Sequence, residues 1–542
     1  MRARRRPLTA AAACGLLGAL SLPACAAVAD GGHGRPEPHV IGGYRHLVVI
    51  YEENHSFDNL YGDWGPVGGQ RVDGLGRDAV RVRQVAQDGT PYRCLAQNDV
   101  NLATPPLEGT CQDAAHGVAA SHFANRPFTI DDYIGPEDRT CPAPGVSAPN
   151  GVPEDADGAE PGGCTRDLVH RFYQEQYQID HGRQDRYVTG SDAIGLTMGV
   201  YDTRELPIWK YLHSAGAPKY VIADRFFQGA FGGSFLNHQW LIAGRAPVDT
   251  SAGPGGPDEG LHSVLDAAGF PNAGYPLYKP ATAVKDAQLT QACGPTANPA
   301  FACGDYAVNT IQPASAPHGG GARLPLIDDA AYPNIGDRLS GKGVSWAWYS
   351  GGWDDAEAGH PGPLFQYHHQ PFNYFAAYAP GQPGRAHLKD ETAFVEAAEE
   401  GTLPAVSFVK PYGAENEHPG YASEPNGSDH LVDLLKTVQS GPQAKDTLVV
   451  VTYDEFGGQW DHVAPPGRDG RTRGASDRFG PGTRIPALIV GGSLRHSGVD
   501  HTVYDTTSII ATIERGLKLA PVGVRDTKVN DLTGALRAAG SL

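Results

Sequence analysis

Residues 448–462 of the chain read LVVVTYDEFGGQWDH, a buried-strand pattern that runs directly into two acidic residues. Leu448–Asp454 is a near-continuous run of β-branched and aromatic residues, which is typical of a strand covered on both faces of a parallel sheet. Gly457 and Gly458 follow the acidic pair, and they allow other backbone to approach closely. The segment therefore predicts a core strand of an α/β fold with polar groups at its carboxyl end.

Five further runs have the same character. We expect strands at His46–Glu53, Tyr220–Phe227, Val344–Ser350, Ala405–Lys410 and Ile485–Val490. Helical patterns fall between them, for example at Asp429–Val438 and Thr507–Leu517, each with a capping-type residue at its start. Strands separated by long intervals that contain helices favour an α/β fold around a parallel sheet.

The composition favours one core with long loops. The chain of 542 residues carries 70 Gly and 44 Pro, a heavy load for several compact domains. Two regions rich in Pro, Gly and Cys lack periodicity, at about residues 62–165 and 245–340. We interpret both as insertions in a single catalytic domain that covers residues 30–542.

Residues 1–29 have the pattern of an export signal peptide. A basic head that includes Arg4 and Arg5 precedes an apolar run from Leu8, and Ala27-Val28-Ala29 fits a cleavage site. The run is too short for a stable membrane span. We therefore expect a secreted, periplasmic or cell-envelope protein, exported by the general or the twin-arginine route, with lipid anchoring at Cys25 as the less favoured alternative.

Six cysteines follow the signal peptide, and an even number in an exported chain indicates disulfides. Pairing of sequence neighbours gives Cys94–Cys111, Cys141–Cys164 and Cys293–Cys303, although six cysteines allow 15 pairings.

The formal charge is −18, and it becomes −22 once four signal arginines are removed. Such a surface repels nucleic acid and anionic lipid, so we expect no nucleic-acid partner. A phosphorylated ligand must then meet positive charge that is concentrated in a site.

Two predicted strands end in groups that suit a metal. Glu53 and Asn54 stand at the end of the expected strand 46–53, and Asp454 and Glu455 stand at the end of the expected strand 448–454. Ligands of parallel sheets bind where strands end at their carboxyl edge, so these side chains are expected to meet. One such strand end alone is equally well a helix cap or a surface turn. Oxygen-rich ligation indicates one divalent cation, with Ca²⁺, Mg²⁺, Mn²⁺ and Fe²⁺ all allowed.

Ser234 lies in Gly229–Trp240, which follows the strand 220–227 and opens an apolar, helix-like segment. At a helix N-terminus, unpaired N–H groups favour an anion. From the residues alone, helix capping explains Ser234 more simply, and the alternative is a nucleophile that attacks phosphorus. Candidate histidines for binding phosphate and protonating the leaving oxygen are His170, His368, His369 and His418.

The blocks VVIYEENHSFDNLYG, GGSFLNHQW, NEHPG and TYDEFGGQWDHV resemble the bacterial phosphoesterase family of secreted acid phosphatases and phospholipases C, within the alkaline-phosphatase-like superfamily. The resemblance extends from about residue 45 to 517. It implies a three-layer α/β/α sandwich around a mainly parallel sheet. It also implies Ser234 as nucleophile, His418 as general acid and His170 as a phosphate contact. The implied metal ligands are Glu53, Asn54, Asp454 and Glu455, and the implied substrate-binding residues are Asn54, His368 and His369.

The resemblance implies a hydrolase of phosphoric esters that acts on a small phosphorylated substrate or a phospholipid headgroup. Many phospholipase members carry Thr where this chain has Ser234, so we favour an acid phosphatase, with phospholipase C as the alternative. A non-catalytic secreted binding protein on the same fold is the alternative of another class. A sulfatase is discounted because the chain has no C/S-x-P-x-R segment.

Overall fold

The computed structural model describes residues 39–76, 79–97, 101–102, 107–247, 310–321 and 323–542. Glu37–Leu542 form one compact unit. The predicted signal peptide, the Cys293–Cys303 pair and most of the second insertion lie outside the described residues. No helix among those described is long and apolar enough to cross a membrane.

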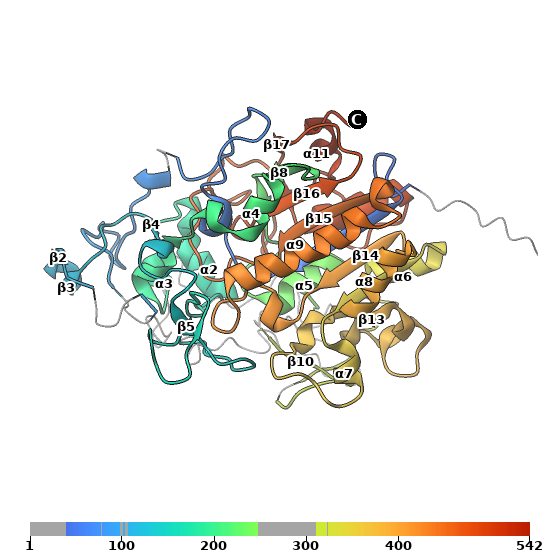
Figure 1. The fold of residues 1–542 in the computed structure, drawn as a ribbon, viewed down its shortest axis with the longest axis horizontal. Coiled ribbons are helices and arrows are strands. Elements are labelled where there is room, and N and C mark those ends of the chain that lie inside the picture. Colours follow the sequence, from blue (N-terminus) through green and yellow to red (C-terminus); the bar gives the residue numbers. More distant parts are fainter. Residues whose placement is uncertain (1–38, 77–78, 98–100, 103–106, 248–309, 322) are drawn as a thin grey trace, which may run out of the picture. The chain divides into compact units, whose positions relative to one another are not determined.

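An eight-stranded sheet forms the centre of the fold (Figure 1). Seven strands run in one direction and β16 runs against them, since it pairs antiparallel with both of its neighbours. The fold is therefore α/β with a mainly parallel sheet, as the sequence predicted. In spatial order the strands are β13 (Leu388–Asp390), β12 (Trp346–Ser350), β14 (Val406–Lys410), β1 (His46–Glu52), β15 (Thr447–Tyr453), β16 (Ala487–Gly491), β8 (Lys219–Ala223) and β17 (Gly498–Asp500).

Helices cover both faces of the sheet. Tyr51 of β1 donates a hydrogen bond to the carbonyl of Asn237 in α5, so α5 lies on the face to which Tyr51 points. The next residue, Glu52, pairs in register with Tyr453, whose hydroxyl reaches Glu417 beside the start of α9 on the other face. The larger helices are α2 (Phe172–Ile179), α5 (Ser234–Ala243), α6 (Ile335–Lys342), α8 (Glu391–Glu400), α9 (Glu424–Ser440) and α10 (Thr507–Leu517).

Five shorter helices complete the described set: α1 (Phe57–Tyr61), α3 (Tyr187–Gly190), α4 (Pro207–Leu212), α7 (Trp353–Glu357) and α11 (Thr533–Ala538). Small two-stranded pairs lie outside the main sheet: β2 (Cys111–Asp113) with β3 (Val118–Ser121), β4 (Phe128–Thr129) with β7 (Gly199–Val200), β5 (Arg139–Cys141) with β6 (Glu160–Pro161), β9 (Phe226–Phe227) with β18 (Tyr504–Asp505), and β10 (Gln312–Pro313) with β11 (Arg323–Leu324).

The predicted strand 220–227 is wrong as a single element. The chain leaves the main sheet after β8 and enters a separate pair at β9. The break occurs at Asp224 and Arg225, because Asp224 uses its carboxylate to accept hydrogen bonds from the backbone of Asp73 and from His501.

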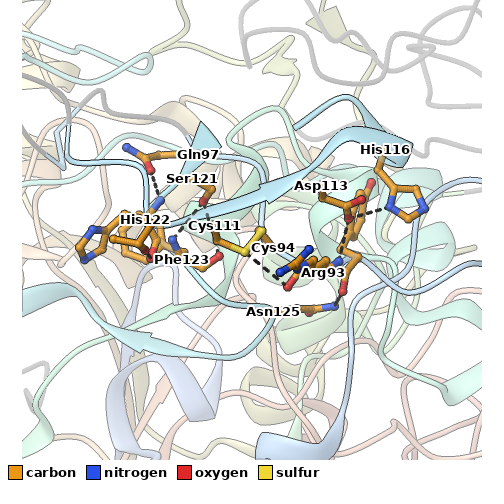
Figure 2. The surroundings of a disulfide bond; sticks show 12 residues. Arg93, Cys94, Gln97, Cys111, Asp113, His116, Ser121, His122, Phe123 and Asn125 are labelled. Carbon is orange, nitrogen blue, oxygen red and sulfur yellow. Dashed lines mark hydrogen bonds and ion pairs between the residues drawn. A yellow bond between two sulfur atoms is a disulfide. The ribbon is translucent and has the colours of Figure 1, made fainter. Parts of the chain in front are cut away.

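The first insertion is fastened by two local disulfides, and both match the predicted pairs. Cys94–Cys111 is flanked by Asp113, which accepts a hydrogen bond from the backbone of Arg93 (Figure 2). Cys141–Cys164 closes a loop of 23 residues. A region without periodicity is thus held by covalent cross-links and isolated short strands.

Candidate active site

The carboxyl ends of three adjacent strands build the site. β14, β1 and β15 are neighbours in the sheet, and the segments that follow them carry His418, Glu53 with Asn54, and Asp454 with Glu455. All five of these residues are buried. The expectation that these strand ends meet at one edge is met by the topology.

Ser234 is the first residue of α5, and its cap position is taken by Gly233. The simpler interpretation of Ser234 as a helix cap is therefore wrong. The Ser234 side chain instead lies beside Asp454, where it acts to lower the pKa of that carboxyl. Ser234 is 3% exposed, so α5 presents a hydroxyl in an enclosed place beside the strand-end carboxylates.

Each of the two carboxylates after β15 uses one oxygen to hold backbone and leaves the other without a hydrogen bond. Asp454 Oδ1 accepts from the N–H of Glu455 at 2.8 Å, and Glu455 Oε2 accepts from the N–H of Gly457 at 2.7 Å. Asp454 Oδ2 and Glu455 Oε1 have no hydrogen-bond partner among the described residues. Asn54 Oδ1 is in the same condition. Glu53 Oε1, in contrast, lies within ion-pair distance of Lys410 and His369.

Buried oxygens without hydrogen bonds are costly, and a cation that accepts their lone pairs removes the cost. Glu53, Asp454 and His238 each bring one ligand atom into a group whose members lie within 4.8 Å of one another. The donors are mainly carboxylate oxygens, with an amide oxygen close by in sequence. These residues fit a divalent cation.

The electrostatics agree with this fit. Burial, followed by the charge of Glu53, raises the pKa of Asp454 to about 7. Burial also raises the pKa of Glu455 well above its usual range. Burial acts the same way on Glu53, but His369 and Lys410 outweigh it and hold that pKa well below its usual range. Closely spaced buried carboxylates are stabilised only by added positive charge.

His170 and His418 lie together beside the strand ends, with ring centroids 6.1 Å apart. His170 Nε2 is 3.2 Å from Glu455 Oε1, and His170 Nδ1 is 3.3 Å from Asp167 Oδ1. Burial opposes the charged form of His170, but Glu455 and Asp167 prevail and raise its pKa to about 10. His170 is therefore an imidazolium in this arrangement.

His418 is oriented by hydrogen bonds at both ring nitrogens. Its Nδ1 donates to the carbonyl of Pro419 at 2.7 Å, and its Nε2 lies 3.0 Å from Asn54 Nδ2. Because Nδ1 is committed to the backbone, Nε2 is the nitrogen that faces the site. Asn54 thus contacts His418 through its amide nitrogen and keeps its oxygen free for another partner.

The His368-His369 doublet lies on the other side of Glu53. His369 Nε2 is 2.5 Å from Glu53 Oε1, and the rings of His368 and His369 have centroids 4.6 Å apart. Burial lowers the pKa of His369 to about 4 and that of His368 well below its usual range. For the doublet, burial therefore outweighs the nearby carboxylate, in contrast to His170.

Three residues that the sequence did not single out also contact the site. Lys410 at the end of β14 is fully buried, with Nζ 3.0 Å from Glu53 Oε1. His238 lies one turn after Ser234 in α5, with Nδ1 3.8 Å from Asp454 Oδ2. The Tyr421 hydroxyl is 3.3 Å from Glu53 Oε2. A signal existed for two of them, because His238 stands four residues after Ser234 and Lys410 ends a predicted strand.

The distal parts of the two acidic blocks form a separate ionic cluster. Arg484 donates to Asp58 Oδ1 at 2.9 Å and to Asp461 Oδ1 at 3.1 Å, and His462 Nδ1 is 2.6 Å from Asp58 Oδ2. Because Arg484 occupies the space between the carboxylates, this cluster binds the two site-forming segments to each other.

Comparison with known proteins identifies a matching family and similar sequences. The model of the family described as the Phosphoesterase family matches residues 44–520. Phospholipase C B of Mycobacterium tuberculosis is 22% identical over 93% of this chain and 80% of its own length. A non-hemolytic phospholipase C of Pseudomonas aeruginosa is 26% identical over 40% of this chain and 34% of its own.

Among solved structures, a protein of the alkaline phosphatase superfamily from Vibrio parahaemolyticus is 13% identical over 38% of this chain and 53% of that chain, with a TM-score of 0.21. That similarity is low, and the fold assignment rests on the sheet itself.

Proposed function

The chain belongs to the phosphoesterase family and hydrolyses phosphoric ester bonds, and from this premise we propose that it is a metal-dependent phosphomonoesterase whose nucleophile is Ser234. The observation that carries the proposal is the position of Ser234 at the start of α5, beside Asp454, whose Oδ2 has no hydrogen-bond partner among the described residues. We also propose that residues 30–542 form a single catalytic domain and that residues 1–29 are a signal peptide that directs export of the protein from the cell.

The nucleophile is prepared by its surroundings. Asp454 lies beside the Ser234 hydroxyl, and its carboxylate orients the hydroxyl for attack. The Ser234 hydroxyl gives its proton to solvent as its oxygen forms a bond to phosphorus. The ester P–O bond breaks and the leaving oxygen takes a proton, and water later hydrolyses the phosphoserine to release phosphate. The N-terminus of α5 adds unpaired N–H groups that favour the phosphoryl charge.

The histidines divide the remaining work. His170 is cationic and neutralises a phosphoryl oxygen. His418 is the general acid for the leaving oxygen, and its Nε2, which accepts from Asn54 Nδ2 in this structure, must first take up a proton. Asn54, His368 and His369 complete the contacts to substrate. A divalent ion held by Glu53, Asn54, Asp454 and Glu455 supplies Lewis-acid activation of the hydroxyl.

The test uses the mature protein and p-nitrophenyl phosphate. Ser234→Ala should abolish turnover without unfolding the chain, because Gly233 rather than Ser234 caps α5. Trapped phosphoserine at Ser234 supports the assignment, and activity within about tenfold of wild type overturns it. Asp454→Asn and Glu53→Gln should each lose stoichiometric metal and activity together. If the activity of the wild-type protein survives chelation, the proposed role of the metal is refuted.

The second candidate is a phospholipase C, which the names of the similar proteins favour. Glycerophosphate, phosphatidylcholine and bis-p-nitrophenyl phosphate, each assayed with the same preparation, separate the two. Preference for the diesters replaces the proposed monoesterase with a phospholipase.

A further inference from the structure

The loop before Ser234 is held by a buried carboxylate that lies outside the site described above. Glu175 of α2 is fully buried, and its Oε2 accepts hydrogen bonds from the N–H of Gly232 at 2.5 Å and from Gln228 Nε2 at 3.0 Å. Its Oε1 accepts from the N–H and the hydroxyl of Thr483 at 2.7 and 2.8 Å. Gly232 is two residues before the nucleophile.

Both backbone groups can only donate, so Glu175 must offer lone pairs on both oxygens. Burial raises the pKa of Glu175 to about 7, against the effect of these hydrogen bonds. The ionised form therefore costs free energy, and a neutral side chain would avoid that cost. The free-energy cost of burying ionised Glu175 indicates that its carboxylate holds the Gly232 peptide for a reason other than stability.

The same network reaches the strand-end carboxylates. Gln228 Oε1 accepts from the N–H of Phe456 at 2.9 Å, and Phe456 directly follows Glu455. Gln228 Nε2 also donates to the carbonyl of Ala230 at 2.7 Å, inside the loop. The pair of Glu175 and Gln228 therefore sets the distance between the loop and the segment that carries Asp454.

The fit against α2 is close. Gly232 has φ +82°, and a Cβ there would lie 2.5 Å from the backbone nitrogen of Phe172, the first residue of α2. His170 precedes that residue by two positions. One contact surface thus sets the start of α5, which carries the nucleophile, relative to a phosphate-binding histidine.

We propose that Glu175 is a positioning residue for Ser234: its hydrogen bond to Gly232 sets the first turn of α5 and the direction of the Ser234 hydroxyl, without contact to substrate. The inference rests on the proposed role of Ser234 as nucleophile.

The test is Glu175→Gln in the full mature chain, with p-nitrophenyl phosphate as substrate. The amide has one acceptor oxygen, so either Gly232 or Thr483 faces a second donor. A shift of about 1 Å in a reacting group costs about 10²-fold, so we expect kcat to fall by about 10²-fold. KM should stay within about threefold of wild type, because the substrate contacts are untouched. Metal content should be unchanged.

The matched control is Thr483→Val, which removes a hydrogen bond to the other oxygen of Glu175 and leaves the Gly232 contact in place. It should lower the melting temperature about as much as Glu175→Gln but keep kcat within about threefold. A second variant, Gln228→Leu, removes the hydrogen bond to Phe456 and should also lower kcat while KM stays unchanged. It provides the test if the Glu175→Gln variant does not fold.

Equal kcat values for the Glu175 and Thr483 variants, or a rise in KM with kcat preserved, overturns the positioning role. Ser234→Ala separates the two proposals. If the Ser234→Ala enzyme is active, the proposed function is refuted. If the Ser234→Ala enzyme is inactive and the Glu175→Gln enzyme is fully active, only the positioning role of Glu175 is refuted.

Discussion

Replacement of Lys410 by Met tests how the site balances its charges. Lys410 Nζ lies 3.0 Å from Glu53 Oε1, and both side chains are fully buried. Methionine has nearly the same length and shape, so the change removes charge with little loss of packing. It leaves Glu53 facing His369, whose pKa burial lowers to about 4.

The magnitude follows from that distance. At an effective dielectric constant of about 20, unit charges 3.0 Å apart interact by about 5 kcal/mol, and removing one partner of a buried pair typically costs about 3–5 kcal/mol. We expect the metal-free variant to be destabilised by this amount. A divalent ion restores positive charge beside Glu53, so the metal-loaded variant should lose less. The difference must appear as tighter metal binding, by about tenfold for each 1.4 kcal/mol.

Urea unfolding in chelator and in Mn²⁺ or Ca²⁺, with calorimetric titration of each metal, measures both quantities. Lys436→Met is the control, because Lys436 is exposed in an ion pair with Asp433 and should contribute only about 0–1 kcal/mol. Equal destabilisation with and without metal, or weaker metal binding by Lys410→Met, refutes the reasoning.

Three further outcomes are expected. His418→Ala should slow an alkyl phosphate much more than p-nitrophenyl phosphate, because nitrophenolate leaves without a proton, and equal losses on both substrates would rule out His418 as general acid. Cys141→Ser with Cys164→Ser should lower the free energy of unfolding by about 3 kcal/mol, since the disulfide closes a loop of 23 residues, and a melting curve unchanged by mutation or reduction would contradict this. Burial, against the hydrogen bond from Tyr201, raises the pKa of Glu424 to about 8, so its contribution to stability is present below pH 4.5 and is lost as the pH rises through 8. Glu424→Gln should flatten the decline of unfolding free energy between those pH values, by up to about 1.4 kcal/mol per pH unit, and parallel profiles would disprove it.

The sequence predicted the parts of the fold that local pattern determines. The bounds of β1 and β15 lie within one residue of the predicted strands, and α10 has the predicted bounds. These elements were predictable because the pattern of a buried strand or an amphipathic helix depends only on consecutive residues. The reversed direction of β16 was not predicted, since an apolar run carries no sign of its direction. The strand at 220–227 failed because the partners of Asp224 are distant in sequence.

The candidate site follows the same division. Glu53, Asn54, Asp454 and Glu455 were predicted as ligands because they stand at the ends of recognisable strands, and the topology places those strand ends side by side. Lys410 was missed although it ends such a strand, because a terminal lysine is ordinarily exposed and its burial depends on Glu53, far away in the chain. The charge state of His170 likewise depends on Glu455, which only the folded chain brings within 3.2 Å.

The position of β1 in the sheet has a consequence for biosynthesis. Its neighbours, β14 and β15, begin at residues 406 and 447, so the first strand leaves the ribosome long before either partner exists. At about 5–20 residues per second, the delay amounts to roughly 20–80 s. During that time the apolar strand β1 has no strand to pair with. The nascent chain can then bind chaperones, associate wrongly with other chains or enter an export apparatus that accepts unfolded protein. Ribosome-bound chains that stop before residue 447 should therefore remain sensitive to protease at β1.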